Sequence, residues 1–484
     1  MTSSQPGVQI SKKAFIQAAV IILALMLLSG VLTRILPAGQ FARVVVEGRG
    51  DVIQPDSFQF IDRPEYPVWR WFLAPLEVLI FPGNVTVIGI ILFILLVGVA
   101  FALLERAGVL QYAIHSIVRR FGHQKYTLLL VLTFFFMALG GFFGILEEVI
   151  PLVPIVIALA LSLGWDVLTG LGISILAANV GFSTAVFNFF TIGTAQRLAG
   201  LPLFSGWVPR LMLFIVMYLV LAVFLTRHAR RIEGKSARSP GPPDNAPIGI
   251  AQSEISPGSA SGDEPRLRRA ALFMGAMFVL ILISVMFLTW QESLSDLAMP
   301  VSGLLFLAGG VGAALMAGMG KRAWGAIWHG FLGIAPAVPL LLMAASVQLI
   351  ISSGGILDTL LYYASTFFAD TSPFVSVLLI YGLTLVLELF ISSGSAKAFL
   401  VIPILMPLAD LVGVNRQIAV SAYAFGDGFS NLVYPTNALL LIALSLTGMA
   451  YFKWLKWVLR LWVWVIPITV AFLALAVVFN YGPF

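Results

Sequence analysis

The sequence has 484 residues, of which 60% are hydrophobic and only 10% are charged. Because a soluble domain has about a quarter of its residues charged, this composition excludes a soluble enzyme as well as a disordered or coiled-coil chain. The net charge of +6 fits basic loops that orient a membrane protein rather than a nucleic-acid partner, and the absence of cysteine excludes disulfides and thiolate metal sites.

Apolar stretches of about 20 residues predict membrane-spanning helices. Basic residues flank the expected cytoplasmic ends, as Lys12 and Lys13 do before the first span and Lys125 does after the second. The polar segment 37–83 is therefore placed outside, and residues 108–121 are expected to form a surface helix. The predicted full spans of the first half are residues 14–36, 84–104 and 208–225.

Two further apolar blocks of the first half are interrupted. Residues 126–164 contain GGFFGILEEVIP at 140–151, which combines glycines, two carboxylates and a proline. This centre predicts a re-entrant hairpin whose tip lies inside protein, because irregular backbone is not tolerated against lipid. Residues 167–199 are predicted to form a broken transmembrane helix. The first repeat half comprises residues 1–226 and ends where the next segment, a linker, begins.

A linker follows at residues 227–269. It contains SPGPPDN and SPGSASGDEP and many basic residues. A segment rich in Ser, Pro and Gly does not build a packed core, and its positive charge favours the cytoplasm. We therefore expect a disordered cytoplasmic linker between two halves.

The second half, residues 270–484, repeats the pattern. A hairpin is predicted at 373–412 around ISSGSAK and a broken helix at 417–449, whereas residues 352–372 are placed outside. With the broken helices, the chain has about nine full spans and two hairpins, and its C-terminus lies outside. The other full spans are residues 270–290, 299–319, 326–351 and 454–479, and the predicted interface anchors are Trp454, Trp457, Trp462 and Trp464.

The two halves also resemble each other in sequence. NVGFSTAVFNFF at 179–190 aligns with GDGFSNLVYPTN at 426–437, and residues 152–164 align with 401–413 at nearly the same spacing. The first interrupted block is entered from the cytoplasmic side and the second from outside. Inverted repeats with broken helices are typical of secondary transporters, so the predicted fold is an all-α polytopic membrane protein with two inverted-topology repeats.

Four segments are expected to converge near the bilayer midplane. They are the two hairpin tips (143–148 and 392–397) and the two helix breaks (183–191 and 430–437). Unwound backbone at that depth exposes amides and carbonyls that bind a substrate or an ion. Charged residues there cost at least about 2.5–3.5 kcal/mol, which makes them candidate binding residues. These are Glu147, Glu148, Lys397 and Asp427; the polar candidates are Ser183, Thr184, Asn188, Ser392, Ser393, Gly394, Ser395, Ser430, Asn431, Thr436 and Asn437.

Glu148 and Lys397 occupy matching positions in the two halves, which raises an ion pair between the two tips as a hypothesis. The sequence offers no firm metal site and no cofactor motif. Sodium ions at the tips and breaks, or protons on the carboxylates, are both open as the coupling ion.

The stretch SSGSAKAFLVIPILMPLADLVGVNRQIAV at 392–420, followed by FGDGFSNLVYPTNALL at 425–440, resembles the YfcC family of the C4-dicarboxylate anaerobic carrier group in the ion transporter superfamily. LTRILPAGQF at 32–41 and GILEEVIP at 144–151 resemble it as well. The resemblance implies a homodimer, a scaffold and a moving transport domain in each protomer, and elevator-type alternating access. It also implies connecting arms near 108–121 and 355–369, and substrates that are dicarboxylates or amino acids, including arginine–ornithine exchange.

The expected function is secondary active transport of a small charged metabolite across a bacterial cytoplasmic membrane, with the N-terminus inside. The acidic excess at the site favours a basic amino acid such as arginine or ornithine, moved by exchange. The alternatives are a C4-dicarboxylate carrier coupled to Na+ or H+, and a passive channel. An enzyme is not expected, because there is no H-E-x-x-H motif and no histidine beside the serine-rich tip.

Overall fold

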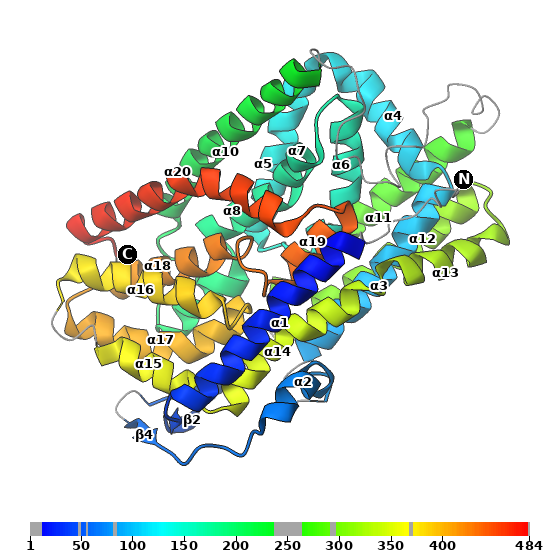
Figure 1. The fold of residues 1–484 in the computed structure, drawn as a ribbon. Helices are drawn as coiled ribbons and strands as arrows, with labels where there is room; N and C mark the ends of the chain where they lie inside the picture. The colour runs from blue at the N-terminus through cyan, green and yellow to red at the C-terminus, as the bar shows by residue number, and fades with distance from the viewer. Residues whose placement is uncertain are drawn as a thin grey trace.

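The computed structural model describes residues 12–46, 50–54, 57–80, 85–236, 264–290, 297–366 and 371–482. This part of the chain is mostly helical (Figure 1). Its helices include 7 stretches long and apolar enough to cross a membrane, so the chain is an integral membrane protein. These are Val87–Arg106, Val109–Phe143, Val167–Thr184, Trp207–Gly234, Glu264–Val285, Arg322–Ser353 and Tyr451–Val478. The number of about nine full spans stays a prediction.

The predicted outer segment contains short strands, which corrects the all-α prediction. β1 (Gly39–Gln40) pairs antiparallel with β4 (Gln59–Phe60), and β2 (Arg43–Val46) pairs antiparallel with β3 (Gly50–Ile53). The physical reason is local, since this stretch is rich in β-branched residues and has no apolar stripe at helical spacing. α2 (Val68–Glu77) follows and packs against the helix that contains residues 337–353.

One set of helices, which we call the α3 group, surrounds α3 (Val85–Arg106). α3 packs against α12 (Ala298–Met316) and α13 (Arg322–Ile334), and α11 (Glu264–Trp290) packs on α12. Beside them, α1 (Lys12–Ile35) packs along α14 (Ala337–Ser353), as Figure 1 also shows. Together with α2 these helices make up the α3 group.

The remaining long helices form a second set, which we call the α8 group. It comprises α5 to α10 and α16 to α20, and it contains most of the largest buried cluster of apolar side chains. α8 (Ala177–Thr184) packs on α5 (Lys125–Phe143) and on α18 (Arg416–Ser430), and α18 packs on α16 (Pro373–Glu388). Two shorter helices, α4 (Val109–Phe121) and α15 (Leu357–Thr366), lie near the positions predicted for arms.

The first hairpin is interrupted where the sequence predicts it. α5 (Lys125–Phe143) follows the short turn η2 (Gly122–Gln124) and ends at Gly144, which has a φ of 68°. A left-handed residue stops a helix at little cost only when it is glycine. The tip continues into the 3-10 segment η3 (Glu147–Leu152) and then into α6 (Val153–Ser162).

The first broken helix begins with α7 (Val167–Leu171), whose N-cap Asp166 accepts a hydrogen bond from the Thr169 amide. It continues through the π-helical turn η4 (Gly172–Leu176) into α8 (Ala177–Thr184). After a break at residues 185–188 the chain resumes as η5 (Phe189–Gly193) and α9 (Thr194–Leu198). The break therefore falls inside the range predicted for it.

The second hairpin and second broken helix have the corresponding design. α16 (Pro373–Glu388) and α17 (Gly394–Leu411) flank a tip at residues 389–393. The tip therefore lies earlier than the predicted range 392–397, because Ser393 caps α17 and residues 394–397 form the first turn of that helix. α18 (Arg416–Ser430) and α19 (Ala438–Thr447) flank a break at residues 431–437. The chain then ends with α20 (Tyr451–Val478).

The linker and one predicted span also differ from the structure. α10 (Trp207–Ser236) extends into the predicted linker 227–269, because residues 227–236 contain no proline. α11 begins inside the linker at Glu264, with Pro265 in its first turn, where proline is tolerated. The linker residues 237–263 lie outside the described residues. The predicted span 326–351 is a pair of helices, since Pro336 is the N-cap between α13 and α14.

Candidate functional site

Three charged side chains meet beside the second hairpin tip, and all three are buried. Lys397, in the first turn of α17, donates a hydrogen bond to Asp427 of α18 with 2.7 Å between Nζ and Oδ1, and another to Glu388 at the end of α16. Two carboxylates around one ammonium give this cluster an excess negative charge when all three groups are ionised. Among the described residues, Glu388 Oε1 and Asp427 Oδ2 have no hydrogen-bond partner, so the cluster retains acceptor atoms for a further donor.

These ion pairs differ from the hypothesis of a bond between the two tips, because the partners of Lys397 among the described residues, Glu388 and Asp427, both belong to the second half. Glu148 lies partly buried in η3. Glu147 begins η3, but its side chain lies outside the described residues. The matching repeat positions of Glu148 and Lys397 therefore did not identify the partners of the lysine.

The second hairpin tip approaches α18 closely at Gly394. A Cβ on Gly394 would lie 2.8 Å from Asp427 Oδ2 and 3.1 Å from the Thr191 methyl carbon, so only glycine fits. The Gly394 carbonyl accepts a hydrogen bond of 2.5 Å from the Tyr423 hydroxyl. Ser393 caps α17, since its hydroxyl accepts from the Ala396 amide at 3.4 Å.

The two broken helices cross at backbone contact. A Cβ on Gly428 of α18 would lie 2.5 Å from the Ser183 Cα of α8. The Asn179 amide donates to the Gly428 carbonyl at 3.2 Å. Ser183 and Thr184 donate to carbonyls of their own helix, as does Ser430 on α18. These three hydroxyls, predicted as site residues, are buried at the crossing. Each already uses its hydrogen in a bond to a backbone carbonyl of its own helix.

The first helix break is closed by Asn188, a predicted site residue. Its Oδ1 accepts from the amides of Phe190 at 3.0 Å and Thr191 at 3.4 Å, and its Nδ2 donates to the Phe182 carbonyl at 3.2 Å. The first tip touches this break, because a Cβ on Gly144 would lie 2.6 Å from Asn188 Oδ1. Asn188 thus satisfies the backbone on both sides of the break instead of facing an open cavity.

Arg210, a buried residue of α10, also holds the first break and was not predicted. Its guanidinium donates to the carbonyls of Ala185 at 2.8 Å, Val186 at 3.2 Å and Ser205 at 2.9 Å. Ala185 has a φ of 51°, so the break needs no proline. A cation at the C-terminal end of α8 is favoured by the carbonyls exposed there.

The second break is held by Asn431, Asn437 and a tryptophan. Asn437 caps α19 by accepting from the Leu439 and Leu440 amides, and its Nδ2 donates to Asn431 Oδ1 at 3.1 Å. Trp454 is fully buried and donates to the Leu432 carbonyl at 2.9 Å. It therefore supports the break and is not the interface anchor that the sequence predicts.

Unpartnered polar atoms concentrate around these segments. Thr191 of η5 lies against the second tip, and Thr436 lies in the second break, each with a buried hydroxyl that has no partner among the described residues. Ser392 is partly buried at the tip, and the side chain of Ser395 lies outside the described residues. No group of three or more His, Cys, Asp or Glu residues in the described part of the chain could hold a metal ion.

Each hairpin tip contacts the helix that follows the break of the other half. η3 touches α19, and α17 touches η5 and α9. The structure therefore brings the two tips and two breaks into one region, around the α8–α18 crossing. Glu388, Thr191, Asn179 and Tyr423 belong to this region although no sequence argument selected them; only Glu388 carried a usable signal, as a carboxylate inside an apolar run.

Comparisons with known proteins agree with a transporter. The sequence model of DcuC, the C4-dicarboxylate anaerobic carrier family, matches residues 15–478. Over 475 residues the chain is 27% identical to the Escherichia coli (strain K12) protein named "Putative basic amino acid antiporter YfcC", covering 90% of this chain and 91% of that protein. An uncharacterized protein of Haemophilus influenzae is 24% identical over 378 residues, which are 78% of this chain and 73% of that one.

Two solved transporters resemble the structure weakly. The YdaH transporter of Alcanivorax borkumensis has 14% identity and a TM-score of 0.44, over 96% of this chain and 100% of that chain. MtrF of Neisseria gonorrhoeae, described among antimetabolite efflux pumps, has 14% identity and a TM-score of 0.39, over 94% of both chains. Nothing further follows from likenesses at this level. The family match over almost the whole length is decisive, and the chain belongs to the C4-dicarboxylate anaerobic carrier family.

Proposed function

We propose that the protein is a secondary active transporter that exchanges basic amino acids by elevator-type alternating access. The observation that carries this proposal is the buried cluster of Glu388, Lys397 and Asp427, which has two carboxyl groups for one ammonium and unpartnered carboxyl oxygens. When both carboxyl groups are ionised, one additional cation, such as a guanidinium or an ammonium, balances the cluster. The name of the Escherichia coli relative supports the same substrate class.

The transport mechanism is proposed from the architecture. The two interrupted hairpins and two broken helices meet in one region, as in transporters built from inverted repeats. In the proposal the α8 group is the transport domain, the α3 group is the scaffold, and α4 and α15 are connecting arms. A homodimer formed through the scaffold, with the chain's N-terminus and linker 227–269 in the cytoplasm and its C-terminus outside, completes this proposal.

A C4-dicarboxylate carrier coupled to Na+ or H+ is the second candidate. Its support is the description of the matching family and the presence of Lys397, which is a partner for a substrate carboxylate once it is released from Glu388. A passive channel is the third candidate, because the same hairpins and breaks also suit a conducting pore.

Uptake into proteoliposomes separates these candidates. Labelled arginine, ornithine and succinate are offered with a proton gradient, with a sodium gradient, or with unlabelled counter-substrate inside. Basic amino acid exchange predicts arginine uptake only with arginine or ornithine inside. Uptake of succinate alone would establish the dicarboxylate carrier, and an ion current without uptake would establish the channel.

A matched pair of variants tests the site. Asp427→Asn removes a charge from the buried cluster and should reduce exchange at least tenfold. Asp410→Asn makes the same chemical change at an exposed carboxylate that pairs with Arg416, and should leave exchange unchanged. Normal exchange by both variants, at equal amounts of folded protein, would contradict the assignment of the cluster as the substrate site.

A further inference from the structure

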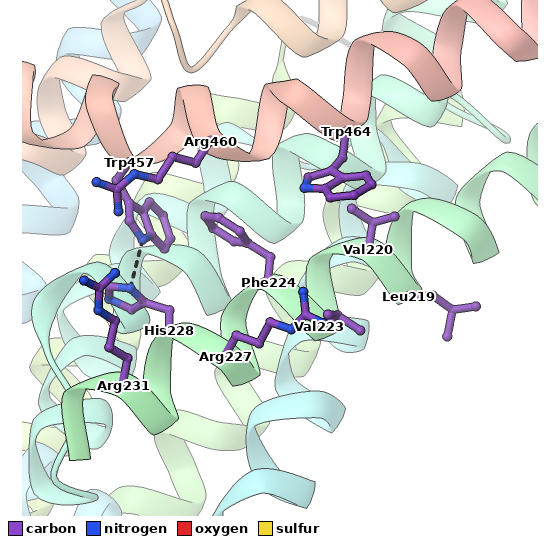
Figure 2. Close-up of a pocket in the computed structure, with 10 residues that line it drawn as sticks. All are labelled: Leu219, Val220, Val223, Phe224, Arg227, His228, Arg231, Trp457, Arg460 and Trp464. Atoms are coloured by element: carbon purple, nitrogen blue, oxygen red, sulfur yellow. Dashed lines mark hydrogen bonds between the residues drawn. The ribbon is translucent and has the colours of Figure 1, made fainter. Parts of the chain in front are cut away.

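A pocket of about 440 Å³ lies between α10 and α20 (Figure 2), and none of the residues of the charged cluster lines it. Three arginines line it, Arg227 and Arg231 of α10 and Arg460 of α20. None of them has an ion pair or hydrogen bond with a residue that the structure describes, and no described lining residue is acidic. The pocket therefore combines concentrated positive charge with free donors.

Two of the arginines lie together at one end of the pocket, and the rest of the pocket is mostly apolar. Figure 2 shows the guanidinium groups of Arg231 and Arg460 beside the Trp457–His228 pair, whereas the Arg227 side chain extends towards Val223. Leu219, Val220, Val223 and Trp464 line the rest, and Leu219 and Trp464 are exposed. From residue 219 to residue 231 a helix rises about 18 Å, which spans a phosphate headgroup and the first part of an acyl chain.

Trp457 and His228 form the wall of the pocket beside Arg231 and Arg460, and hydrogen bonds hold both rings in place. Trp457 donates from its indole nitrogen to His228 Nδ1 at 3.1 Å. Because indole is a donor only, His228 Nδ1 must accept, and the ring's hydrogen on Nε2 is directed at Asp166, 3.1 Å away. Burial raises the pKa of the Asp166 carboxyl, but hydrogen bonds from His228 and Thr169 outweigh it and hold the pKa below its usual value. Both ring nitrogens are thus occupied, and the arginines are the available donors.

Position along the helices points to the membrane interface. Arg227 and Arg231 follow directly on the apolar run of α10, whose exposed side chains include Ile215, Leu219 and Val223. At such a boundary arginine reaches phosphate oxygens with its planar fork of donors, and tryptophan prefers the same depth. Basic residues that merely orient a membrane protein need no pocket, whereas these three share one.

We infer that this pocket binds the headgroup of an anionic phospholipid, with the phosphate held by Arg231 and Arg460, the Arg227 charge nearby, and an acyl chain lying along the apolar part of the pocket. The inference does not depend on which substrate the protein transports. Its site is separate from the cluster of Glu388, Lys397 and Asp427.

Purified full-length protein tests this by native mass spectrometry with added phosphatidylglycerol or phosphatidylcholine. The wild-type protein should retain phosphatidylglycerol at least tenfold more strongly than phosphatidylcholine. Arg231→Gln with Arg460→Gln should weaken retention of phosphatidylglycerol about 25-fold, as expected for two basic residues near a phosphate. The matched control, Lys321→Gln with Arg322→Gln, removes the same charge from an exposed helix end of the α3 group and should change retention less than twofold.

A competition with inorganic phosphate identifies the source of the phosphate group. Displacement of the lipid by millimolar phosphate in the wild-type protein would show a site for a soluble anion and would overturn the lipid proposal. Equal loss in the pocket variant and the control would show non-specific charge attraction and would overturn it too. Thermal unfolding of each variant in zwitterionic detergent verifies that the pocket variant is folded when its lipid retention is measured.

Discussion

At the scale of residues, the feature with the largest energetic consequence is the lysine buried between two carboxylates. Removing one partner from a buried ion pair leaves an uncompensated charge and costs about 3–5 kcal/mol. Here the central lysine has two partners, whereas each carboxylate has one. The lysine is therefore the residue that the cluster tolerates losing least.

Lys397→Met should lower the unfolding temperature more than Glu388→Gln does, because it leaves two facing carboxylates without a counter-charge. The double variant Glu388→Gln/Lys397→Met should recover part of that loss, since it removes one of the two repelling charges. Unfolding temperatures of the purified variants check this order. A double variant less stable than Lys397→Met would contradict the described pairing.

Gly394→Ala is expected to abolish transport while leaving a folded protein. The added methyl would meet the Asp427 carboxylate at 2.8 Å and push it away from Lys397. Gly382→Ala, in the neighbouring helix α16, is the control, because a Cβ there has nothing within 4 Å. Substrate uptake of the two variants should differ by more than tenfold, and similar uptake would show that the tip is not closely packed on α18.

At the scale of elements, the sequence located the interruptions better than it explained them. Glycines, two carboxylates and a proline marked the first hairpin, and the small polar segment ISSGSAK marked the second. The second break contains Pro435, which helps to explain it. The first break has no proline and depends on Arg210, which lies in another helix, so only tertiary structure reveals it. Likewise, Glu388 has no counterpart in the first half, and the repeat could not select it as the partner of Lys397.

Tertiary contacts also explain the other differences. Trp454 was predicted at the interface, but it is fully buried and finds a hydrogen-bond acceptor, the Leu432 carbonyl. An indole with a partner is stable in the interior, and sequence alone does not show that partner. The short strands of the outer segment escaped prediction because pairs of two to four residues leave no long pattern.

Arg210→Gln should destabilise the protein by about 3 kcal/mol, because carbonyls at the first break lose charged hydrogen-bond donors and stay buried. Lys453→Gln, at an exposed position of α20, is the charge-matched control and should have no effect on stability. Unfolding temperatures of both variants give the comparison. Equal temperatures for Arg210→Gln and the wild-type protein would show that the break holds without the arginine.

At the scale of the whole molecule, the division into an α3 group and an α8 group makes a mechanical prediction. α14 and α19 belong to different groups and touch, whereas α1 and α14 belong to the same group. Since the natural sequence has no cysteine, introduced pairs report without background. A disulfide between α14 and α19 should block uptake until it is reduced, and one between α1 and α14 should not. Full uptake with the α14–α19 disulfide formed would exclude relative movement of the groups.

The contact between Gly428 and Ser183 limits how the molecule changes shape. If α18 slid one turn along α8, Ala424 would replace Gly428, and its methyl would have to occupy space already taken by the Ser183 backbone. This close backbone packing prevents α18 from sliding along α8. The two broken helices therefore move as one unit in any conformational change. In the proposed alternating-access cycle, the two halves of the binding region would keep their register while the region opens to one side of the membrane and then to the other.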